Sequence, residues 1–264
     1  MHKFVTCRLG AFLLLGLVGT AMAHSATVSV CADPDPPPWT YWIRDTQGQK
    51  TARFTGFSVD VFTAVFNKLG HEVRFIGDVP WARCLKMVEN REVDFAMDAY
   101  FNPEREKVFA YSRHYNTLTP QVFFRAEAPL KVVAKADLQP YRGCGMLGAS
   151  YAHYGLRSEQ LDLGVNTYQG MINKLKANRC DYFVEELEVI AGYKKLGIDH
   201  LGDKALRHKP VPDAEAPAKH LIAAKNSPSA ALLPAIDQQL DTLITSGQIV
   251  KLWKKHGGTS AYKP

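Results

Sequence analysis

The sequence predicts an α/β protein of two lobes, each a mainly parallel sheet flanked by helices, with two strands that join the lobes as a hinge. Three observations predict this fold. Strand and helix periodicities alternate over residues 27–99, the same order returns over residues 142–186, and β-rich stretches flank this second half. The chain has 264 residues, of which 46% are hydrophobic and 22% charged, so each lobe can bury a core of its own.

The first half follows the order strand, helix, strand, helix, strand. Residues 27–31 alternate between apolar and polar side chains, as a half-buried strand does. The apolar side chains of residues 58–69 recur at helical spacing and share one face. The remaining elements are expected as a strand at 73–76, a helix over 81–90 and a strand at 93–99. This order is the unit of a parallel sheet with helices on both faces.

The second half repeats the order more loosely. A strand is expected at 142–147, a helix at 168–177 and a strand at 182–186. Residues 228–256 then supply further helices, with apolar side chains on one face.

Two β-rich stretches, 120–126 and 219–224, are expected to carry the chain from the first lobe to the second and back. We therefore assign residues 24–120 and 225–264 to the first lobe and 121–224 to the second, with a hinge strand at each end. Because an α/β sheet binds ligands beyond the carboxyl ends of its strands, we expect a small-molecule cleft between the lobes. The alternative is two independent domains with no shared site.

The first 23 residues have the pattern of a secretory signal peptide. Lys3 and Arg8 form a basic start, residues 9–18 are an apolar run, and the small residues around Met22 end in a cleavage site near Ala23. The run is shorter than the ~20 residues that a membrane-spanning helix needs, and no later segment comes closer. We therefore expect a soluble mature chain that is exported to the periplasm.

The charge and the histidine pattern indicate neither a nucleic-acid partner nor a metal. Lys and Arg exceed Asp and Glu by six, which is too little for a polybasic surface, so we expect no nucleic-acid partner. The nine histidines show no HExxH or paired spacing, and no CxxC pair occurs, so we expect no metal and no cofactor.

Four cysteines follow the expected signal peptide, and an oxidising compartment preserves disulfides. They are Cys31, Cys84, Cys144 and Cys180. Three pairings are possible, and the sequence alone does not choose between them. We favour Cys31–Cys84 with Cys144–Cys180, because each pair then lies within one expected lobe.

An ordered set of short motifs resembles the exported solute-binding proteins of ABC importers, specifically family 3, the polar amino-acid type. Residues 56–61 resemble its GFdvDl segment, and residues 94–97, 102–105 and 109–112 resemble its D-strand, TpeR and FS segments. Residues 148–151 stand where the family has GtsY. The set covers essentially all of the mature chain, and it implies a type II periplasmic-binding-protein fold.

Arg105 is the residue to which the resemblance gives the most defined role, because the matching arginine of the family binds the α-carboxylate of the ligand. A guanidinium holds a carboxylate through two charge-assisted hydrogen bonds. Asn102 is a good N-cap and Pro103 suits a first helical turn, so backbone N–H groups are expected to point at the same anion. The alternative is an exposed arginine paired with Glu104 or Glu106, and the motif favours the binding role.

The second lobe is expected to supply the opposite charge. Glu185 and Glu186 end the strand at 182–186, where the family places an aspartate for the ammonium of the ligand. Counting from Asp181, Glu186 is the match and is one methylene longer; the alternative is a solvated acidic run. Ser150 is expected to donate a hydrogen bond to the carboxylate, and its surroundings depart from the GxSxG elbow of a nucleophilic serine.

Aromatic residues are expected to recognise the side chain of the ligand. Trp39 lies near the position where the family stacks a ring on its ligand, whereas for Phe57, a lesser candidate, core packing is the commoner fate. Trp81 is a further candidate, although packing of its helix on the sheet is the commoner explanation. Asp98 and Tyr100 replace the small or hydroxyl residues that touch the ligand in the family. The acid indicates that the pocket reads a cationic or hydroxylated group, so the ligand need not be a standard amino acid.

The resemblance implies a monomeric periplasmic protein that closes on a small amino-acid-like or carboxylate-bearing solute and presents it to a membrane ABC permease. Two alternatives stay open at this point. One is an enzyme on the same scaffold, such as a cyclohexadienyl dehydratase, in which a buried Glu186 would act as a general acid. The other is the ligand-binding component of a sensory system.

Overall fold

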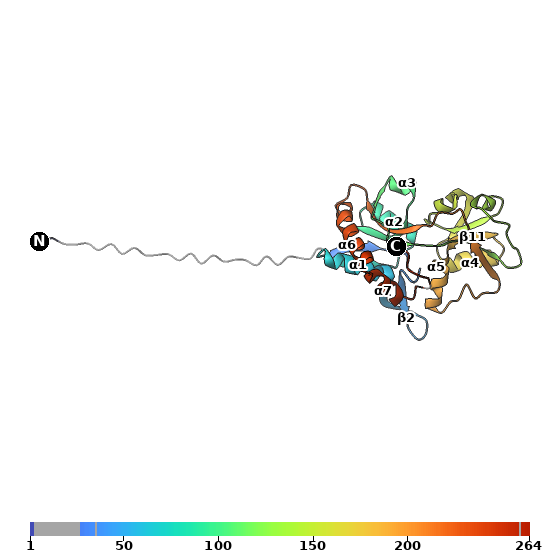
Figure 1. Cartoon of the computed structure of the whole chain (residues 1–264), viewed down its shortest axis with the longest axis horizontal. Helices are drawn as coiled ribbons and strands as arrows, with labels where there is room; N and C mark the ends of the chain where they lie inside the picture. Colours follow the sequence, from blue (N-terminus) through green and yellow to red (C-terminus); the bar gives the residue numbers. More distant parts are fainter. Residues whose placement is uncertain (3–26, 35, 259) are drawn as a thin grey trace.

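Two lobes lie side by side in the computed structural model of the chain (Figure 1). The structure describes residues 1–2, 27–34, 36–258 and 260–264. The expected signal peptide and its cleavage site near Ala23 lie outside these residues.

The first lobe is built on a six-stranded sheet in the order β4-β1-β5-β13-β6, with β7 also paired to β13. Its parallel strands are β1 (Thr27–Cys31), β4 (Glu72–Ile76) and β5 (Phe95–Tyr100). Strand β13 (Ala218–Ala224) pairs antiparallel with β5, with β6 (Phe109–Tyr111) and with β7 (Asn116–Thr117). The sheet is mixed and still mainly parallel, because β13 lies between β5 and β6 and runs against both, while the other five strands run in one direction.

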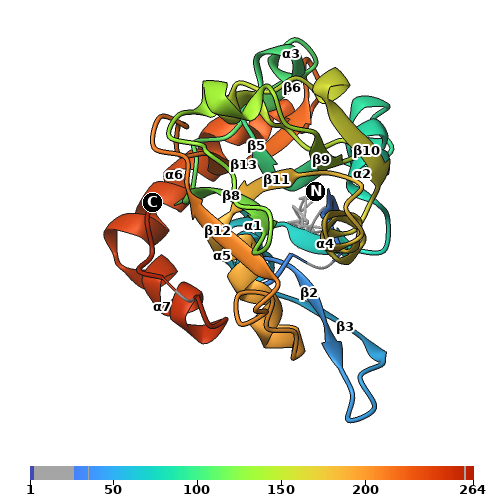
Figure 2. The ribbon, with the colours of Figure 1, turned by 90° about the vertical axis from the view of Figure 1, so that its right-hand side faces the viewer.

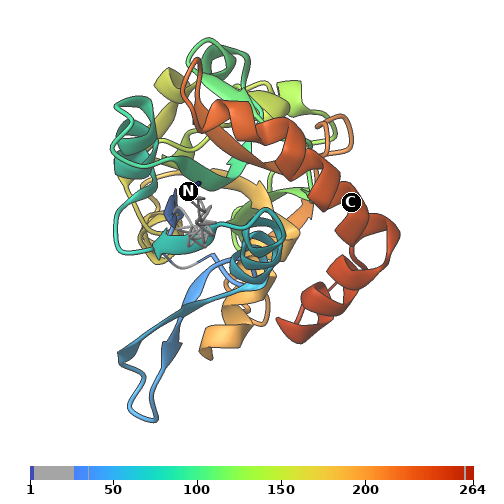
Figure 3. The same cartoon turned by 90° about the vertical axis from the view of Figure 1, so that its left-hand side faces the viewer.

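Helices cover both faces of this sheet. One face carries α1 (Phe57–Lys68), α6 (Leu233–Thr245) and α7 (Gln248–Lys255), and the other carries α2 (Trp81–Glu89). In Figure 3, α6 and α7 form the orange to red edge of the molecule. The alternation of a strand explains the two layers, because Val30 faces α1 while the next residue, Cys31, faces α2.

The second lobe has a five-stranded sheet in the order β10-β9-β11-β8-β12. Its parallel pairs join β9 (Gly143–Met146) to β10 (Leu161–Val165) and to β11 (Tyr182–Glu186). Strand β8 (Pro120–Arg125) pairs antiparallel with β11 and with β12 (Leu206–Pro210). Helices α4 (Tyr168–Lys176) and α5 (Leu187–Gly192) pack on one face. Both sheets thus share one plan, three parallel strands extended by antiparallel pairs.

Short elements complete the chain. The α-helix α3 (Pro103–Glu106) follows β5. Single 3₁₀ turns lie at Lys135–Leu138, Ala152–Tyr154, Ser158–Gln160, Tyr193–Leu196 and Ala230–Leu232. A hairpin of β2 (Tyr41–Arg44) and β3 (Lys50–Thr55) extends away from the body of the first lobe (Figure 2).

The chain crosses between the lobes twice, after β7 and after β12. Each expected hinge strand belongs to one sheet only: β8 lies in the second sheet and β13 in the first. The expected assignment of residues 218–224 to the second lobe is therefore wrong. Antiparallel pairing with β5 and β6 holds β13 in the first sheet, so the return crossing lies before Ala218.

Both expected disulfides are confirmed. Cys31–Cys84 joins β1 to α2 with a Cα–Cα distance of 5.8 Å, and Cys144–Cys180 joins β9 to the segment before β11 with 5.7 Å. Each disulfide therefore fixes a helical layer or loop to the sheet of its own lobe. Across the described residues, no helix combines the length and the apolar character that a membrane span requires.

Candidate ligand-binding site

Both lobes enclose a cavity of about 50 Å³ near the carboxyl ends of β5 and β11. The first lobe contributes Asp33, Pro36, Trp81, Asp98, Tyr100, Arg105 and Lys219. The second lobe contributes Met146, Ala149, Ser150, Tyr151, His153, Tyr154, Tyr168, Val184, Glu185 and Glu186. The site lies where the topology of α/β sheets predicts one, between two sheets at their carboxyl edges.

Polar contacts across the cavity hold the lobes in a closed arrangement. The hydroxyl of Tyr100 donates to Glu186 Oε2 at 2.5 Å, and Asn102 Nδ2 donates to Ser150 Oγ at 3.0 Å. Arg105 donates from its guanidinium to the carbonyl of Gly148. Each of these pairs joins the first lobe to the second, so they form only when the lobes meet.

Arg105 lines the cavity as predicted, and α3 positions it. Asn102 caps this short helix by accepting from the backbone N–H groups of Glu104 and Arg105, at 2.8 and 3.3 Å. Burial lowers the pKa of the Arg105 guanidinium, which nevertheless stays charged at neutral pH. The bond to Gly148 uses one of its five N–H donors. The charged guanidinium of Arg105 therefore lies at a largely enclosed site and keeps further N–H donors for a ligand.

Glu186 also lines the cavity, and both of its carboxylate oxygens have protein partners. Oε2 accepts from Tyr100, while Oε1 lies 2.8 Å from His153 Nε2 and 3.2 Å from the hydroxyl of Tyr154. Burial alone would raise the pKa of this carboxyl. The hydrogen bonds with His153, with Glu185 and with Tyr100 outweigh burial and lower the pKa. Glu186 is therefore the ionised member of the acidic pair.

Glu185 is the neutral member of that pair. Its side chain is buried, and its Oε1 accepts from the backbone N–H of Glu186 at 3.2 Å. Burial raises the pKa of Glu185 well above its usual range, and the charge of Glu186 raises it further. The alternative, a solvated acidic run, is contradicted at these two positions because both side chains are enclosed.

Asp98 lies at an irregularity of β5. Ala96 pairs with Ile222 and Ala99 with His220, so β5 has one more residue than β13 over this stretch. Asp98 lies in this irregularity and has a φ of 68°. Aspartate tolerates this left-handed conformation better than most residues do. Its backbone N–H leaves the ladder and donates to the hydroxyl of Tyr115 at 3.2 Å.

The carboxylate of Asp98 is held through one oxygen. Oδ1 accepts from Ser58 Oγ and from the hydroxyl of Tyr115, both at 2.7 Å, and lies 3.7 Å from Lys219 Nζ. The ammonium of Lys219 is itself buried, 4.2 Å from the centre of the Trp39 ring and 5.2 Å from that of Tyr100.

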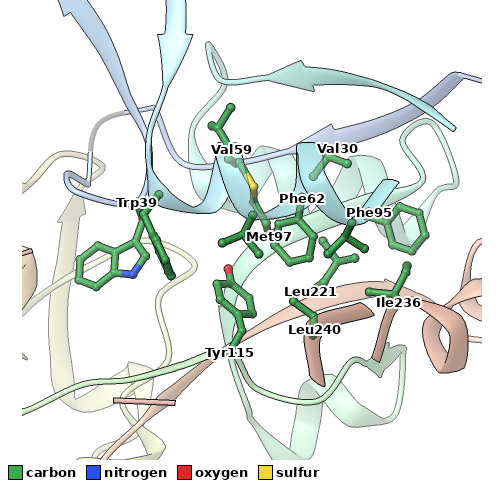
Figure 4. Close-up of a cluster of buried hydrophobic side chains, with 14 of the residues drawn as sticks. Val30, Trp39, Val59, Phe62, Phe95, Met97, Tyr115, Leu221, Ile236 and Leu240 are labelled. Carbon is green, nitrogen blue, oxygen red and sulfur yellow. The ribbon is translucent and has the colours of Figure 1, made fainter. Parts of the chain in front are cut away.

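Trp39 and Phe57 do not line the cavity, and the predicted stacking of Trp39 on the ligand is contradicted. Both side chains are fully buried in the core of the first lobe. Figure 4 shows Trp39 among the buried apolar side chains of this core. The indole N–H of Trp39 donates to Asn116 Oδ1 at 2.7 Å, and its ring centre lies 5.8 Å from that of Trp253. Trp81 instead supplies an indole to the cavity wall, at the start of α2.

Several cavity residues were missed by the sequence analysis. His153 and the tyrosines at 151, 154 and 168 line the second lobe, and Lys219 lines the first. The dense polar and aromatic run at 151–154, which begins at the last residue of the segment resembling GtsY, was a signal for the first three. Lys219 was not recognisable, since its place depends on the pairing of β13 with β5.

Comparison with known proteins identifies the family. The model of the bacterial extracellular solute-binding proteins, family 3, matches residues 28–259. The chain therefore belongs to this family, whose members are extracytoplasmic binding proteins. A search of curated protein sequences gave no match.

Solved structures of similar fold agree with this assignment. The arginine-, lysine-, histidine-binding protein ArtJ of Geobacillus stearothermophilus is 20% identical, with 88% of this chain and 95% of that chain covered and a TM-score of 0.70. An ABC uptake transporter substrate-binding protein of Streptococcus pneumoniae with bound histidine is 18% identical, with 90% and 95% covered and a TM-score of 0.71. A putative L-cystine ABC transporter protein of Listeria monocytogenes is 18% identical, with 90% and 98% covered and a TM-score of 0.71. The chain shares the two-lobed fold of these proteins, and it is a solute-binding protein.

Proposed function

We propose that this protein captures a small amino-acid-like solute outside the cytoplasm and delivers it to a membrane ABC permease. The observation that carries the proposal is the interlobe cavity, which is lined by Arg105, by the buried carboxyl groups of Glu185 and Glu186 and by aromatic side chains of both lobes. A guanidinium is suited to the carboxylate of such a solute, and the buried acids are suited to its donor groups.

Lobe closure is the mechanism of capture. A solute that contacts both lobes stabilises the closed arrangement by the difference between its affinities for the closed and open states. The contacts of Tyr100 with Glu186 and of Asn102 with Ser150 form in the same closed state and therefore add to that preference. The permease then recognises the closed shape.

The processing, oligomeric state and location proposed for the protein follow from its family and its sequence. The signal peptide is removed near Ala23, and the mature chain acts as a monomer in the periplasm. Similar structures of proteins named for arginine, lysine, histidine or cystine support an amino-acid-like ligand class, and the lining of this cavity decides the particular ligand.

Arg105 provides the direct test. Thermal unfolding of the mature chain is measured with each of the twenty L-amino acids, since a ligand that binds only the folded state raises the Tm. We expect at least one amino acid to raise the Tm of the wild type and Arg105→Ala to abolish that shift. Arg105→Lys keeps the charge and loses the planar fork, so it should retain only part of the shift. A full shift in Arg105→Ala would contradict the carboxylate assignment.

A further inference from the structure

Asp98 has a carboxylate oxygen without a protein partner. Oδ2 is buried and makes no hydrogen bond with any described residue, and the side chain as a whole is only 5% exposed. Burying a charged acceptor without a partner is costly, and such an atom in a native structure calls for a ligand, a water or an ion. Oδ1 makes all three protein contacts of this carboxylate, so Oδ2 is the oxygen without a partner in a residue that lines the cavity.

The backbone around Asp98 is built to place this carboxylate. The extra residue in β5 turns the strand locally, and bulges of this kind redirect side chains beside functional sites. The left-handed φ of 68° and the bond from the backbone N–H to Tyr115 fix the turn. Ser58 and Tyr115, both fully buried, then orient the carboxylate through Oδ1.

Glu186 is in the opposite situation. Its two oxygens accept from Tyr100 and Tyr154 and contact His153, and the bond to Tyr100 is made across the cleft. A ligand ammonium at Glu186 would have to share this carboxylate with the protein partners that already hold both of its oxygens. Burial and the charge of Glu186 raise the pKa of Glu185 and keep its carboxyl neutral, so Glu185 has no negative charge with which to bind an ammonium.

We propose that Asp98, rather than Glu186, accepts the ammonium of the bound solute, and that Glu186 acts as a positioning residue that holds the lobes closed. This inference rests on the proposed function. Asp98 and Arg105 belong to the first lobe, so that lobe alone can hold both charges of a zwitterion. The second lobe then adds its tyrosine and histidine side chains to the cavity lining, and Glu186 accepts the hydrogen bond from Tyr100. Lys219 balances the charge of Asp98 from the Oδ1 side.

The test compares amino acids with their 2-hydroxy acids, which keep the carboxylate and replace the ammonium by a hydroxyl. The probes are glycine and glycolate, L-alanine and L-lactate, and L-serine and L-glycerate, whose small size suits the cavity, together with whichever other L-amino acid gives the largest thermal shift. Affinities are measured by calorimetry for the wild type and for Asp98→Asn, Glu186→Gln and Asp33→Asn, the last because Asp33 also lines the cavity. Glu72→Gln, at an exposed site on β4, is the charge control.

Asp98→Asn is the informative variant, because asparagine also tolerates a left-handed φ and its amide oxygen can accept from Ser58 and Tyr115. Its amide N–H₂ then faces the ligand as a donor. We expect the wild type to bind an amino acid and to bind hydroxy acids poorly, and Asp98→Asn to lose about 100-fold in amino-acid affinity. Its preference for the amino acid over a hydroxy acid should disappear. Glu186→Gln should keep that preference while binding both compounds more weakly, because the closed state is less stable.

Other outcomes separate this inference from the proposed function. Amino-acid binding by Asp98→Asn within about threefold of the wild type would overturn the role of Asp98 and leave the proposed function intact. A lost preference in Glu186→Gln or Asp33→Asn, with Asp98→Asn unaffected, would assign the ammonium to that acid instead. Equal wild-type affinity for amino acids and hydroxy acids would show that the cavity does not recognise the ammonium, and would overturn the inference. Binding of neither class would overturn the proposed function and this inference with it.

Discussion

Two adjacent glutamates at the end of β11 hold opposite protonation states although both are buried. Glu186 stays ionised because its oxygens accept from Tyr100 and Tyr154 and contact His153. Glu185 has no comparable set of donors, and burial next to that charge favours its neutral form. Environment rather than residue type therefore decides the charge of each carboxyl.

This difference predicts the pH dependence of stability. The folded-state pKa of Glu185 is raised, so its contribution to stability is fully present below the unfolded pKa of about 4.3 and is lost as the pH rises toward the folded value. Glu185→Gln keeps a neutral side chain at every pH. We expect its Tm to match the wild type near pH 4.5 and to exceed it at pH 8, as followed by circular dichroism. A Tm below that of the wild type at pH 8 would show that the ionised form is the native one.

The predicted site residues fall into two groups at this scale. Arg105, Ser150, Asp98, Tyr100 and the two glutamates lie at the cavity, because they come from short motifs next to strand ends. The prediction for Trp39 was wrong, since a tryptophan after a proline-rich loop can face either the cleft or the core. The sequence contains no local signal that separates these environments.

Elements with strong periodicity were predicted closely, and elements defined by long-range pairing were not. The strand at 27–31 and the helix over 58–69 agree with β1 and α1 to within one residue. The hairpin of β2 and β3 and the edge strand β12 were missed, since they are short and partly exposed. The direction of β13 was also not readable, because its partners β5 and β6 lie far away in the sequence.

Two glycines allow helices of one lobe to approach the backbone of the other. A Cβ at Gly192, the last residue of α5, would lie 1.8 Å from the carbonyl oxygen of Pro37 in the first lobe. A Cβ at Gly148 would lie 3.0 Å from Ala82 of α2. Closure in this protein therefore depends on the absence of a side chain at these contacts.

Gly192→Ala tests this dependence at a position where the helix itself tolerates alanine. Gly192 has an ordinary helical φ of −61°, so alanine should stabilise α5 by about 0.5–1 kcal/mol. The same methyl group blocks the approach of Pro37. We expect an unchanged or higher Tm together with an amino-acid affinity lower by about tenfold or more, which corresponds to at least 1.4 kcal/mol against closure. Unchanged affinity would mean that ligand binding does not require this contact.

The disulfides stabilise each lobe separately. Cys31 and Cys84 are 53 residues apart, and removal of a native disulfide over such a loop typically costs about 2–4 kcal/mol. We expect the double variant Cys31→Ser, Cys84→Ser to lower the Tm by roughly 5–15 °C in thermal scans. Dithiothreitol should lower the Tm of the wild type further than that of the variant. An unchanged Tm in the double variant would show that the α2 layer is held by packing alone.

At the scale of the whole molecule, two mixed sheets meet around a small cavity lined by charged and aromatic side chains, and their contacts serve closure rather than chemistry. The bond from Tyr100 to Glu186 joins the lobes, while the bond from Tyr154 to the same carboxylate lies within the second lobe. The two tyrosines therefore form a matched pair, in which only the first distinguishes closed from open.

Replacement of each tyrosine by phenylalanine separates closure from local stability. A hydrogen bond to a charged group contributes about 1.5–3 kcal/mol, so Tyr100→Phe should weaken amino-acid binding by about 10- to 100-fold. Tyr154→Phe should lower the Tm and leave the affinity within about threefold. Calorimetry and thermal scans on both variants give the comparison, and equal losses of affinity would contradict a specific role of Tyr100 in closure.

Small-angle X-ray scattering during titration with the amino acid that most raises the Tm tests the central claim most directly. The account predicts that the radius of gyration of the mature chain falls and saturates at one ligand per chain, because the solute is held between closing lobes. A ligand that raises the Tm at full occupancy without changing the radius of gyration would contradict capture by closure.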